Sequence, residues 1–392
     1  MINEPLKIAI ATGTRADWGL LTPLAHALAA RDDVELMIIA TNMHLDARYG
    51  MTVNEIIAEG LPLAATVDMK TDGDGDLSRV TAMAKCLDGF GRVFDRLKPD
   101  MVVILGDRYE MLSVATAAAM MKIAIVHIAG GVVSEGAIDD AIRHAITKLS
   151  SLHLTETERY RRRVIQMGEA PETVVATGAL GVWNIGNQSL MSREELSADI
   201  GFDFGGLSAV VTFHPATLDP ADPGERCGAM LEALERFDDM RLLITYPNND
   251  ARSAAIIERI EDFGRRHPER VKVVKSLGMR RFLSALKCVD VVIGNSSGGI
   301  VEVPSCGIPT VDIGIRQRGR DAAGSVIHCG DTADEIAAAI EKALSPEMQA
   351  LAACCDNPYY QPGTPSKMVE AIMGFARDKH DVKRFNDLDF KL

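Results

Sequence analysis

Short apolar runs alternate with longer amphipathic stretches along this chain, and the whole alternation occurs twice. Short apolar runs between turn residues are typical of parallel strands that are buried on both faces. In the first half such runs occupy residues 8–11, 34–40, 101–105 and 123–128. The stretches with apolar residues at the helical period are residues 20–30, 77–97, 109–121 and 138–149. The alternation predicts consecutive βαβ units and therefore a parallel sheet covered by helices.

The pattern restarts after residue 200, which indicates a second unit of the same kind. Its apolar runs are residues 208–213, 240–246, 271–274, 289–293 and 310–313. Because 392 residues exceed what one hydrophobic core usually holds, two domains are expected. We place the first at residues 1–184, joined by a C-terminal helix at 365–392, and the second at 185–364. The predicted fold class is α/β, with two doubly wound domains facing a cleft.

Charge and composition exclude several classes of function. The formal net charge of −13 argues against nucleic acid and anionic membranes as partners, so a phosphate site has to be locally basic. Seven cysteines without a CxxC pair are typical of reduced thiols. The first residues lack the basic start and apolar core of a secretory signal, and no apolar run reaches the roughly 18 residues of a membrane span. We therefore expect a cytoplasmic protein.

An acidic, glycine-rich stretch at residues 72–76 raises the question of a metal site. It alternates aspartate and glycine as the beginning of a calcium loop does, but it lacks the later ligands of such loops. We interpret it as a loop over the cleft, and we predict neither a metal ion nor a cofactor.

Three polar segments follow predicted strands in the first half, at the sheet edge where open α/β sheets bind ligands. Residues 12–17 place Arg15 and Asp17 at the start of a helix, where a guanidinium and backbone N–H groups suit a phosphate, although Asp17 could simply cap the helix. Asp107 and Arg108 follow the run at 101–105. Asp107 could cap a helix, act as an acid or base, or orient a sugar hydroxyl, and we expect Arg108 to bind the substrate. Residues 134–144 form the third segment.

That third segment concentrates ionisable residues just after the run at 123–128. It contains Glu135, Asp139, Arg143 and His144. Asp139 and Arg143 are four residues apart and could form an ordinary surface pair on one helix face. Their position directly after a strand favours a reactive cluster over a solvated face.

The second half repeats this arrangement with smaller and more neutral side chains. His214 ends its first predicted strand, where it could bind phosphate or transfer a proton. Asn248 and Asp250 follow the second strand, and we expect both to bind the substrate. A small-residue loop at 294–299 carries Ser296 and Ser297, whose hydroxyl and N–H groups can donate to phosphate oxygens. The remaining candidates are Glu302, suited to a ribose diol, and Arg316, which adds local positive charge.

Taken in order, these segments resemble the hydrolysing UDP-N-acetylglucosamine 2-epimerases over nearly the whole chain. The segments are Thr14–Asp17, Gly106–Arg108, Gly136–His144, Phe213–Pro215, Pro247–Asp250, Gly294–Ser297 and Gly314–Gln317. The resemblance implies two Rossmann-like domains in a GT-B-like arrangement, a homodimer or homotetramer, and a UDP-sugar substrate. It further implies a place in the synthesis of sialic, legionaminic or related nonulosonic acids.

The resemblance also implies roles for individual residues. Asp107 and Asp139 match family carboxylates implicated in acid/base work, and His214 matches a histidine near the diphosphate. Matches to nucleotide-side positions are Arg15, Asn248, Ser296, Ser297, Glu302 and Arg316. The implied reaction removes the C2 proton while UDP leaves C1, and water then adds to the resulting 2-acetamidoglycal.

One departure from the family pattern concerns a glutamate that several relatives carry near the end of the 123–128 run. This chain has Ala129 and Val132 at the two positions concerned, and we take Glu135 as the candidate replacement. Apolar groups there could instead mark another sugar, such as UDP-diacetylbacillosamine. Three other functions remain open from the residues alone: a non-hydrolysing epimerase, a glycosyltransferase of the same fold, and an inactive sugar-nucleotide sensor.

Overall fold

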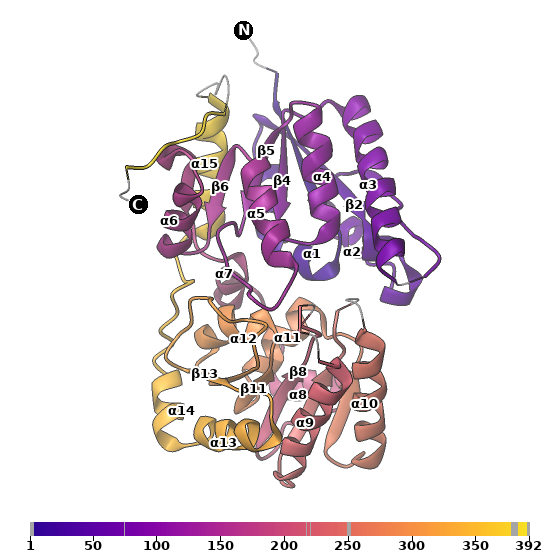
Figure 1. The fold of residues 1–392 in the computed structure, drawn as a ribbon, viewed down its shortest axis with the longest axis vertical. Helices are drawn as coiled ribbons and strands as arrows, with labels where there is room; N and C mark the ends of the chain where they lie inside the picture. The colour runs from indigo at the N-terminus through magenta and orange to yellow at the C-terminus, as the bar shows by residue number, and fades with distance from the viewer. Residues whose placement is uncertain are drawn as a thin grey trace. The chain divides into compact units, whose positions relative to one another are not determined.

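The computed structural model of the protein describes residues 4–73, 75–216, 218–219, 221–248, 252–377 and 383–389. The chain divides into two compact units, which are coloured along the chain in Figure 1. Unit 1 comprises Met1–Val132, Asp139–Trp183 and Gln361–Leu392, and unit 2 comprises Val133–Ile138 and Asn184–Tyr360. Each unit is built on its own parallel sheet.

The sheet of unit 1 has seven parallel strands in the order β3-β2-β1-β4-β5-β6-β7. The strands are β1 (Leu6–Thr12), β2 (Val34–Thr41), β3 (Leu63–Val67), β4 (Met101–Leu105), β5 (Ala124–Ile128), β6 (Leu152–Thr155) and β7 (Val174–Ala176). The strand order reverses between β1 and β4, which is the position where doubly wound sheets bind ligands beyond the carboxyl ends of their strands.

Helices cover both faces of this sheet (Figure 1). The apolar side chains of the sheet are buried beneath them in two cores. One core contains α1 (Arg15–Ala29) and α15 (Thr364–Arg377), and the other contains α3 (Asp76–Leu97) and α4 (Tyr109–Met120). The remaining helices of unit 1 are α2 (Val53–Ala58), α5 (Asp139–Leu149) and α6 (Glu158–Gln166), with short 3₁₀ turns at Asn42–Leu45, Ala47–Tyr49 and Pro171–Thr173. The boundary between the units falls within α7 (Leu180–Asn187).

The sheet of unit 2 has six parallel strands in the order β10-β9-β8-β11-β12-β13, which reverses between β8 and β11. Its strands are β8 (Ser208–Thr212), β9 (Arg241–Thr245), β10 (Val271–Val274), β11 (Val291–Gly294), β12 (Thr310–Ile313) and β13 (Val326–Cys329). Its helices are α8 (Arg193–Ile200), α9 (Pro223–Glu235), α10 (Ser253–Arg266), α11 (Gly278–Leu286), α12 (Ser297–Val301), α13 (Ala333–Ala343) and α14 (Pro346–Ala352), with a 3₁₀ turn at Val303–Cys306. Within the described residues, no helix has both the length and the apolar character needed to span a membrane.

The predicted α/β class with two doubly wound sheets is confirmed, and the strands that were not predicted are those with weak apolar patterns. β3 lies at a sheet edge and is only partly buried, β7 has three residues, and β6 and β13 each contain a histidine. Such segments bury few apolar side chains, so the spacing of apolar residues in the sequence does not indicate a strand there.

The prediction of a helix through residue 392 is wrong for residues 383–389. The helix α15 ends at Arg377, and residues 383–389 have no regular secondary structure. The backbone there bonds to another part of unit 1, because the N–H of Asn386 donates to the carbonyl of Gly168 at 2.9 Å. That external partner replaces the hydrogen bond that a continued helix would supply.

Glu169 is a buried carboxylate that receives this C-terminal segment. Its side chain is 2% exposed and accepts from Lys148 Nζ at 2.5 Å and from His153 Nε2 at 3.0 Å, and it pairs with Lys383 at 2.7 Å. Burial raises the pKa of Glu169, but the hydrogen bonds from His153, Lys148 and Lys383 outweigh it and lower the pKa to about 2. The ionised carboxylate is therefore favoured in the folded state.

We expect Glu169→Gln to lower the free energy of unfolding at pH 7 by about 2 kcal/mol. The folded-state pKa lies below the ordinary value of 4.5, so the carboxylate stabilises the fold above that pH and loses its contribution as the pH falls toward 2. Urea unfolding of both proteins from pH 7 to pH 3 measures this difference. A deficit that stays constant over that range would contradict the assignment.

Candidate functional site

The turn after β1 satisfies its own backbone donors. The Asp17 carboxylate accepts from the N–H groups of Gly13 and Thr14, both at 2.9 Å, while the Thr14 side chain caps α1. Two amides that were expected to meet a phosphate are thus already bonded to Asp17. Arg15 remains the anion-binding candidate of this turn, with a half-buried guanidinium 3.6 Å from Glu55.

Glu110 connects three turns at the carboxyl edge of the unit 1 sheet, and no pattern in the sequence indicates this role. Its fully buried Oε1 accepts from Arg108 Nε at 2.7 Å and from Asn42 Nδ2 at 2.8 Å. The pKa of Asp17 rises to about 6 because of burial and the nearby Glu110 charge, against the opposing effect of Arg108. The Arg108 guanidinium, which was predicted to bind substrate, therefore also stabilises two carboxylates.

Asp107 and Arg143 form the ion pair at the centre of the predicted acid/base cluster. Arg143 is 2% exposed, although it lies in the first half of the short helix α5. One of its nitrogens bonds to Asp107 Oδ2, and another donates to the Val132 carbonyl at 2.7 Å. Asp140 lies 3.6 Å from the same guanidinium. A buried guanidinium thus holds Asp107 beyond the end of β4, with the carboxylate 22% exposed and open to a ligand.

His127 positions the turn that carries Asp107. It is completely buried, with Nε2 2.8 Å from the carbonyl of Gly106 and Nδ1 3.1 Å from Thr147 Oγ1. Because a carbonyl can only accept, Nε2 carries the proton and Nδ1 accepts from the hydroxyl. Burial lowers the pKa of His127 to about 3, so the ring is neutral. Its hydrogen bond to Gly106 connects β5 to the turn after β4.

Asp139 and Glu135, the other two carboxylates of the predicted cluster, fall in different units. Asp139 is the first residue of α5 in unit 1 and is half-buried. Glu135 belongs to the short stretch Val133–Ile138 that groups with unit 2, where its carboxylate lies beside Gly319. The stretch is anchored there by Ser134, which accepts from Arg320 at 3.0 Å. Whether Glu135 replaces the missing glutamate remains a prediction.

His214 and Asn295 join the two strand ends that flank the reversal of strand order in unit 2. The Asn295 side chain accepts from the N–H of His214 at 2.7 Å and donates to the carbonyl of the same residue at 2.8 Å. Asn295 is itself held by Arg316 and Gln317, which both donate to its carbonyl, at 3.0 and 2.8 Å. This reciprocal pairing fixes the turns after β8 and β11 to each other.

The tautomer of His214 follows from its neighbour Asn248. The backbone N–H of Asn248 donates to His214 Nδ1 at 3.1 Å, so Nδ1 is the acceptor and Nε2 carries the proton. Burial and the nearby Arg316 charge hold the pKa of His214 well below its ordinary value. The neutral ring can therefore donate a hydrogen bond from Nε2 to an oxygen, but it does not supply a positive charge.

The small-residue loop after β11 carries hydroxyl groups that are accessible to a ligand. Ser296 precedes α12 and its hydroxyl does not cap that helix, and Ser296 and Ser297 are both partly exposed. Glu302 follows α12, with Oε2 3.3 Å from where a Cβ on Gly298 would stand. The loop therefore offers hydroxyl and N–H groups next to a carboxylate, as a phosphate and a ribose diol require. Asp250, the last predicted binding residue, lies outside the described residues.

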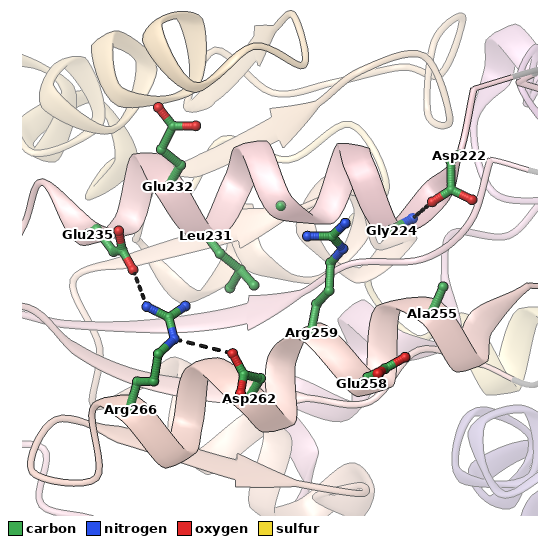
Figure 2. A pocket seen from close by; sticks show the side chains of 11 residues that line it. Asp222, Gly224, Leu231, Glu232, Glu235, Ala255, Glu258, Arg259, Asp262 and Arg266 are labelled. Atoms are coloured by element: carbon green, nitrogen blue, oxygen red, sulfur yellow. Dashed lines mark hydrogen bonds and ion pairs between the residues drawn. The ribbon is translucent and has the colours of Figure 1, made fainter.

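A cavity of about 590 Å³ in unit 2 lies along α9 and α10 and is unsuited to a nucleotide (Figure 2). Five of its lining residues are acidic. Arg266 donates hydrogen bonds to two of them, Glu235 at 2.7 Å and Asp262 at 3.3 Å. That excess of negative charge would repel a diphosphate. None of the residues at the strand ends that carry His214 and Ser297 lines it. Among the described residues, no group of three or more His, Cys, Asp or Glu side chains is arranged to hold a metal ion.

Comparison with known proteins agrees with these features. Residues 26–373 match the family model described as UDP-N-acetylglucosamine 2-epimerase. The chain is 36% identical, over 80% of its length and 82% of the relative's, to the GDP/UDP-N,N'-diacetylbacillosamine 2-epimerase (hydrolyzing) of Campylobacter jejuni. It is 34% identical, over 97% of both chains, to the polysialic acid biosynthesis protein P7 of Escherichia coli.

The fold has solved counterparts as well. A crystal structure of UDP-GlcNAc 2-epimerase from Neisseria meningitidis bound to UDP-GlcNAc superimposes with a TM-score of 0.79 at 16% identity, over 94% of this chain and 100% of that one. The two sheets of the present structure thus match those of a GT-B-like epimerase. The resemblance inferred from the motifs is confirmed, and the chain belongs to the UDP-N-acetylglucosamine 2-epimerase family.

Proposed function

We propose that this protein is a hydrolysing 2-epimerase that converts a UDP-linked N-acetylhexosamine into UDP and the free 2-epimer sugar. The observation that carries the proposal is Asp107, held beyond the end of β4 by the buried Arg143. The protein's relatives that are named as hydrolysing epimerases and as a polysialic acid biosynthesis protein support a product that enters sialic or legionaminic acid synthesis. The family membership supplies the substrate class.

The reaction needs two proton-transfer groups, for which we assign Asp107 and Asp139. One carboxylate removes the proton from C2 as the C1–O bond to UDP breaks and its electron pair leaves with UDP. The product of this step is a 2-acetamidoglycal. Water then adds its hydroxyl to C1, while the second group, which starts as a carboxylic acid, gives its proton to the opposite face of C2. The remaining proton of the water molecule replaces the proton that this group has given up, and the first group releases the C2 proton to solvent. The balance is one water consumed per UDP and free sugar formed.

The residues of unit 2 that we assign to UDP are hydrogen-bond donors and one carboxylate. His214 Nε2, the hydroxyls of Ser296 and Ser297 and the Arg316 guanidinium suit the diphosphate, while Glu302 suits the ribose diol. A diphosphate is a better leaving group when donors stabilise the charge that develops on it. Arg15 of unit 1 and Asn248 and Asp250 of unit 2 complete the proposed set.

Ser297→Ala is expected to weaken UDP binding about tenfold, because a hydrogen bond to a charged oxygen contributes about 1.5 kcal/mol or more. Calorimetric titration of UDP into the variant measures the dissociation constant. Ser197→Ala in α8 removes a hydroxyl from another partly exposed serine of the same unit and should leave the affinity unchanged. Equal affinities of the Ser297→Ala variant and the parent protein would remove Ser297 from the proposed site.

The sugar is tested with two substrates. Ala129 and Val132 place apolar groups where several relatives carry a glutamate, and Val132 is 2% exposed. Incubation with UDP-N-acetylglucosamine and with UDP-diacetylbacillosamine, followed by chromatography of UDP and sugar, should show release of UDP and of the free 2-epimer from at least one. A UDP-linked epimer without free UDP would indicate the non-hydrolysing reaction, and tight UDP binding without turnover would indicate a sensor.

A further inference from the structure

The C-terminal segment 383–389 binds to the carboxyl end of α5. The Lys383 ammonium donates to the carbonyls of Lys148 at 2.7 Å and Ser150 at 2.6 Å, and more distantly to that of Thr147 at 3.4 Å. The last carbonyls of a helix have no partner within the helix, and a cation there also interacts favourably with the helix dipole. Lys383 therefore closes the end of α5 in the way that a local capping residue would, although it lies more than 230 residues further along the chain.

Two further contacts fix this segment in one position. Lys383 pairs with the buried Glu169 at 2.7 Å, so its fourth partner is a carboxylate that is 2% exposed. The Phe385 ring packs directly on Gly168, where a Cβ would lie 2.4 Å from a ring carbon, and the Lys148 ammonium lies 4.9 Å from the ring centre. The segment is thus held by three backbone carbonyls and a buried carboxylate around the Lys383 ammonium, and by the contact of the partly exposed Phe385 ring with Gly168.

The same end of α5 is connected to the turn that carries Asp107. Thr147, whose carbonyl faces Lys383, has its hydroxyl 3.1 Å from His127 Nδ1, and His127 Nε2 donates to the carbonyl of Gly106 at 2.8 Å. One turn earlier on the helix, Arg143 holds the carboxylate of Asp107 itself. These two sets of hydrogen bonds connect α5 to the adjacent residues Gly106 and Asp107. A shift of α5 along its axis would therefore displace the Asp107 carboxylate and the neighbouring backbone together.

We propose that the C-terminal segment, through Lys383, is a positioning element for Asp107. Lys383 fixes the end of α5, and α5 carries Arg143, which holds Asp107 directly, and Thr147, which holds the preceding residue through His127. The kinetic part of this inference rests on the proposed epimerase function. A continuous chain of contacts is not by itself a coupling, so the tests change Lys383 and measure the effect at the turn that carries Asp107.

The kinetic test uses Lys383→Met, which keeps the length of the side chain and removes the charge. We expect kcat for UDP-sugar hydrolysis to fall about tenfold with KM changed less than twofold, because small displacements of a reacting group affect the chemical step. Lys383→Arg should recover most of the loss. Lys367→Met is the matched control, because Lys367 also lies near the C-terminus but donates to Gln361 instead of α5. Equal kcat values for Lys383→Met and the control would overturn the proposal.

A second test needs no turnover and separates this proposal from the epimerase assignment. In Lys383→Met, hydrogen exchange of the amides in residues 104–110 and 139–149 should be at least tenfold faster than in the Lys367→Met control. A chain ending at residue 382 should exchange equally fast, and a synthetic peptide of residues 383–392 should restore its protection. If the parent protein hydrolyses no UDP-sugar while the exchange pattern is as expected, the proposed function fails and the positioning role stands. Unchanged exchange at 104–110 would refute the positioning role.

Discussion

Asp107→Asn is expected to lower kcat for UDP-sugar hydrolysis by about a thousandfold and to leave UDP affinity within twofold. An acid/base group in position contributes roughly 10²–10⁴-fold to a rate, and an amide has no basic oxygen with which to remove the C2 proton. The shape of the side chain is kept, so the amide oxygen can still accept from Arg143. The proposed UDP ligands His214 and Ser297 belong to unit 2 and are not altered.

This prediction is checked by steady-state kinetics together with UDP titration and thermal unfolding. Asp95→Asn is the control, because Asp95 lies near the end of α3, is 73% exposed and pairs with Lys98. Unfolding matters because the substitution removes the charge beside the buried Arg143 and can cost stability. A folded Asp107→Asn variant that retains more than a tenth of the parent kcat would show that another group removes the proton.

Gly294→Ala is expected to lower the free energy of unfolding by about 4 kcal/mol or more, enough to leave unit 2 largely unfolded at 37 °C. Gly294 has φ +139, which L-residues rarely adopt, and a Cβ there would stand 1.9 Å from the carbonyl oxygen of Thr212. That carbonyl belongs to β8, and the N–H of Asn295 bonds to it, so neither strand can move aside without breaking the turn that joins His214 and Asn295.

Denaturant unfolding followed by circular dichroism measures this effect. Gly186→Ala in α7 is the control, because a Cβ at that position meets no atom within 4 Å and alanine favours the helix by about 0.5–1 kcal/mol. The control should therefore be as stable as the parent or slightly more so. A Gly294→Ala variant within about 1 kcal/mol of the parent would mean that the β8 and β11 ends are not packed as described.

The fold was largely predictable because its long strands are buried on both faces and produce continuous apolar runs. β2 and β10 begin where the apolar runs begin, and the register of β1 against β2 keeps seven consecutive pairs. The edge strand β3 and the three-residue β7 bury too little to stand out in the sequence. The C-terminal segment could not be placed from sequence, because its position depends on a distant carboxylate, Glu169.

The candidate site was predictable where function needs a group at the end of a strand. Asp107, Arg143, His214 and Ser297 all stand out as polar residues after apolar runs. The residues that hold them do not, because their partners are distant in sequence: Asn295 is 81 residues from His214, and Glu110 is 68 residues from Asn42. His127 lies inside a buried strand, where a neutral histidine resembles any other core residue. Such partners become visible only when the strand order is known.

The measurement that tests the epimerase assignment most directly is the isotope content at C2 of the sugar released in deuterium oxide. The protein is incubated with UDP-N-acetylglucosamine or UDP-diacetylbacillosamine, and proton NMR follows the free sugar. We expect one UDP released per free sugar, with inverted configuration and deuterium at C2 because the proton is exchanged with solvent. Released sugar that retains its original C2 proton and configuration would contradict the account, since it would show hydrolysis without removal of that proton.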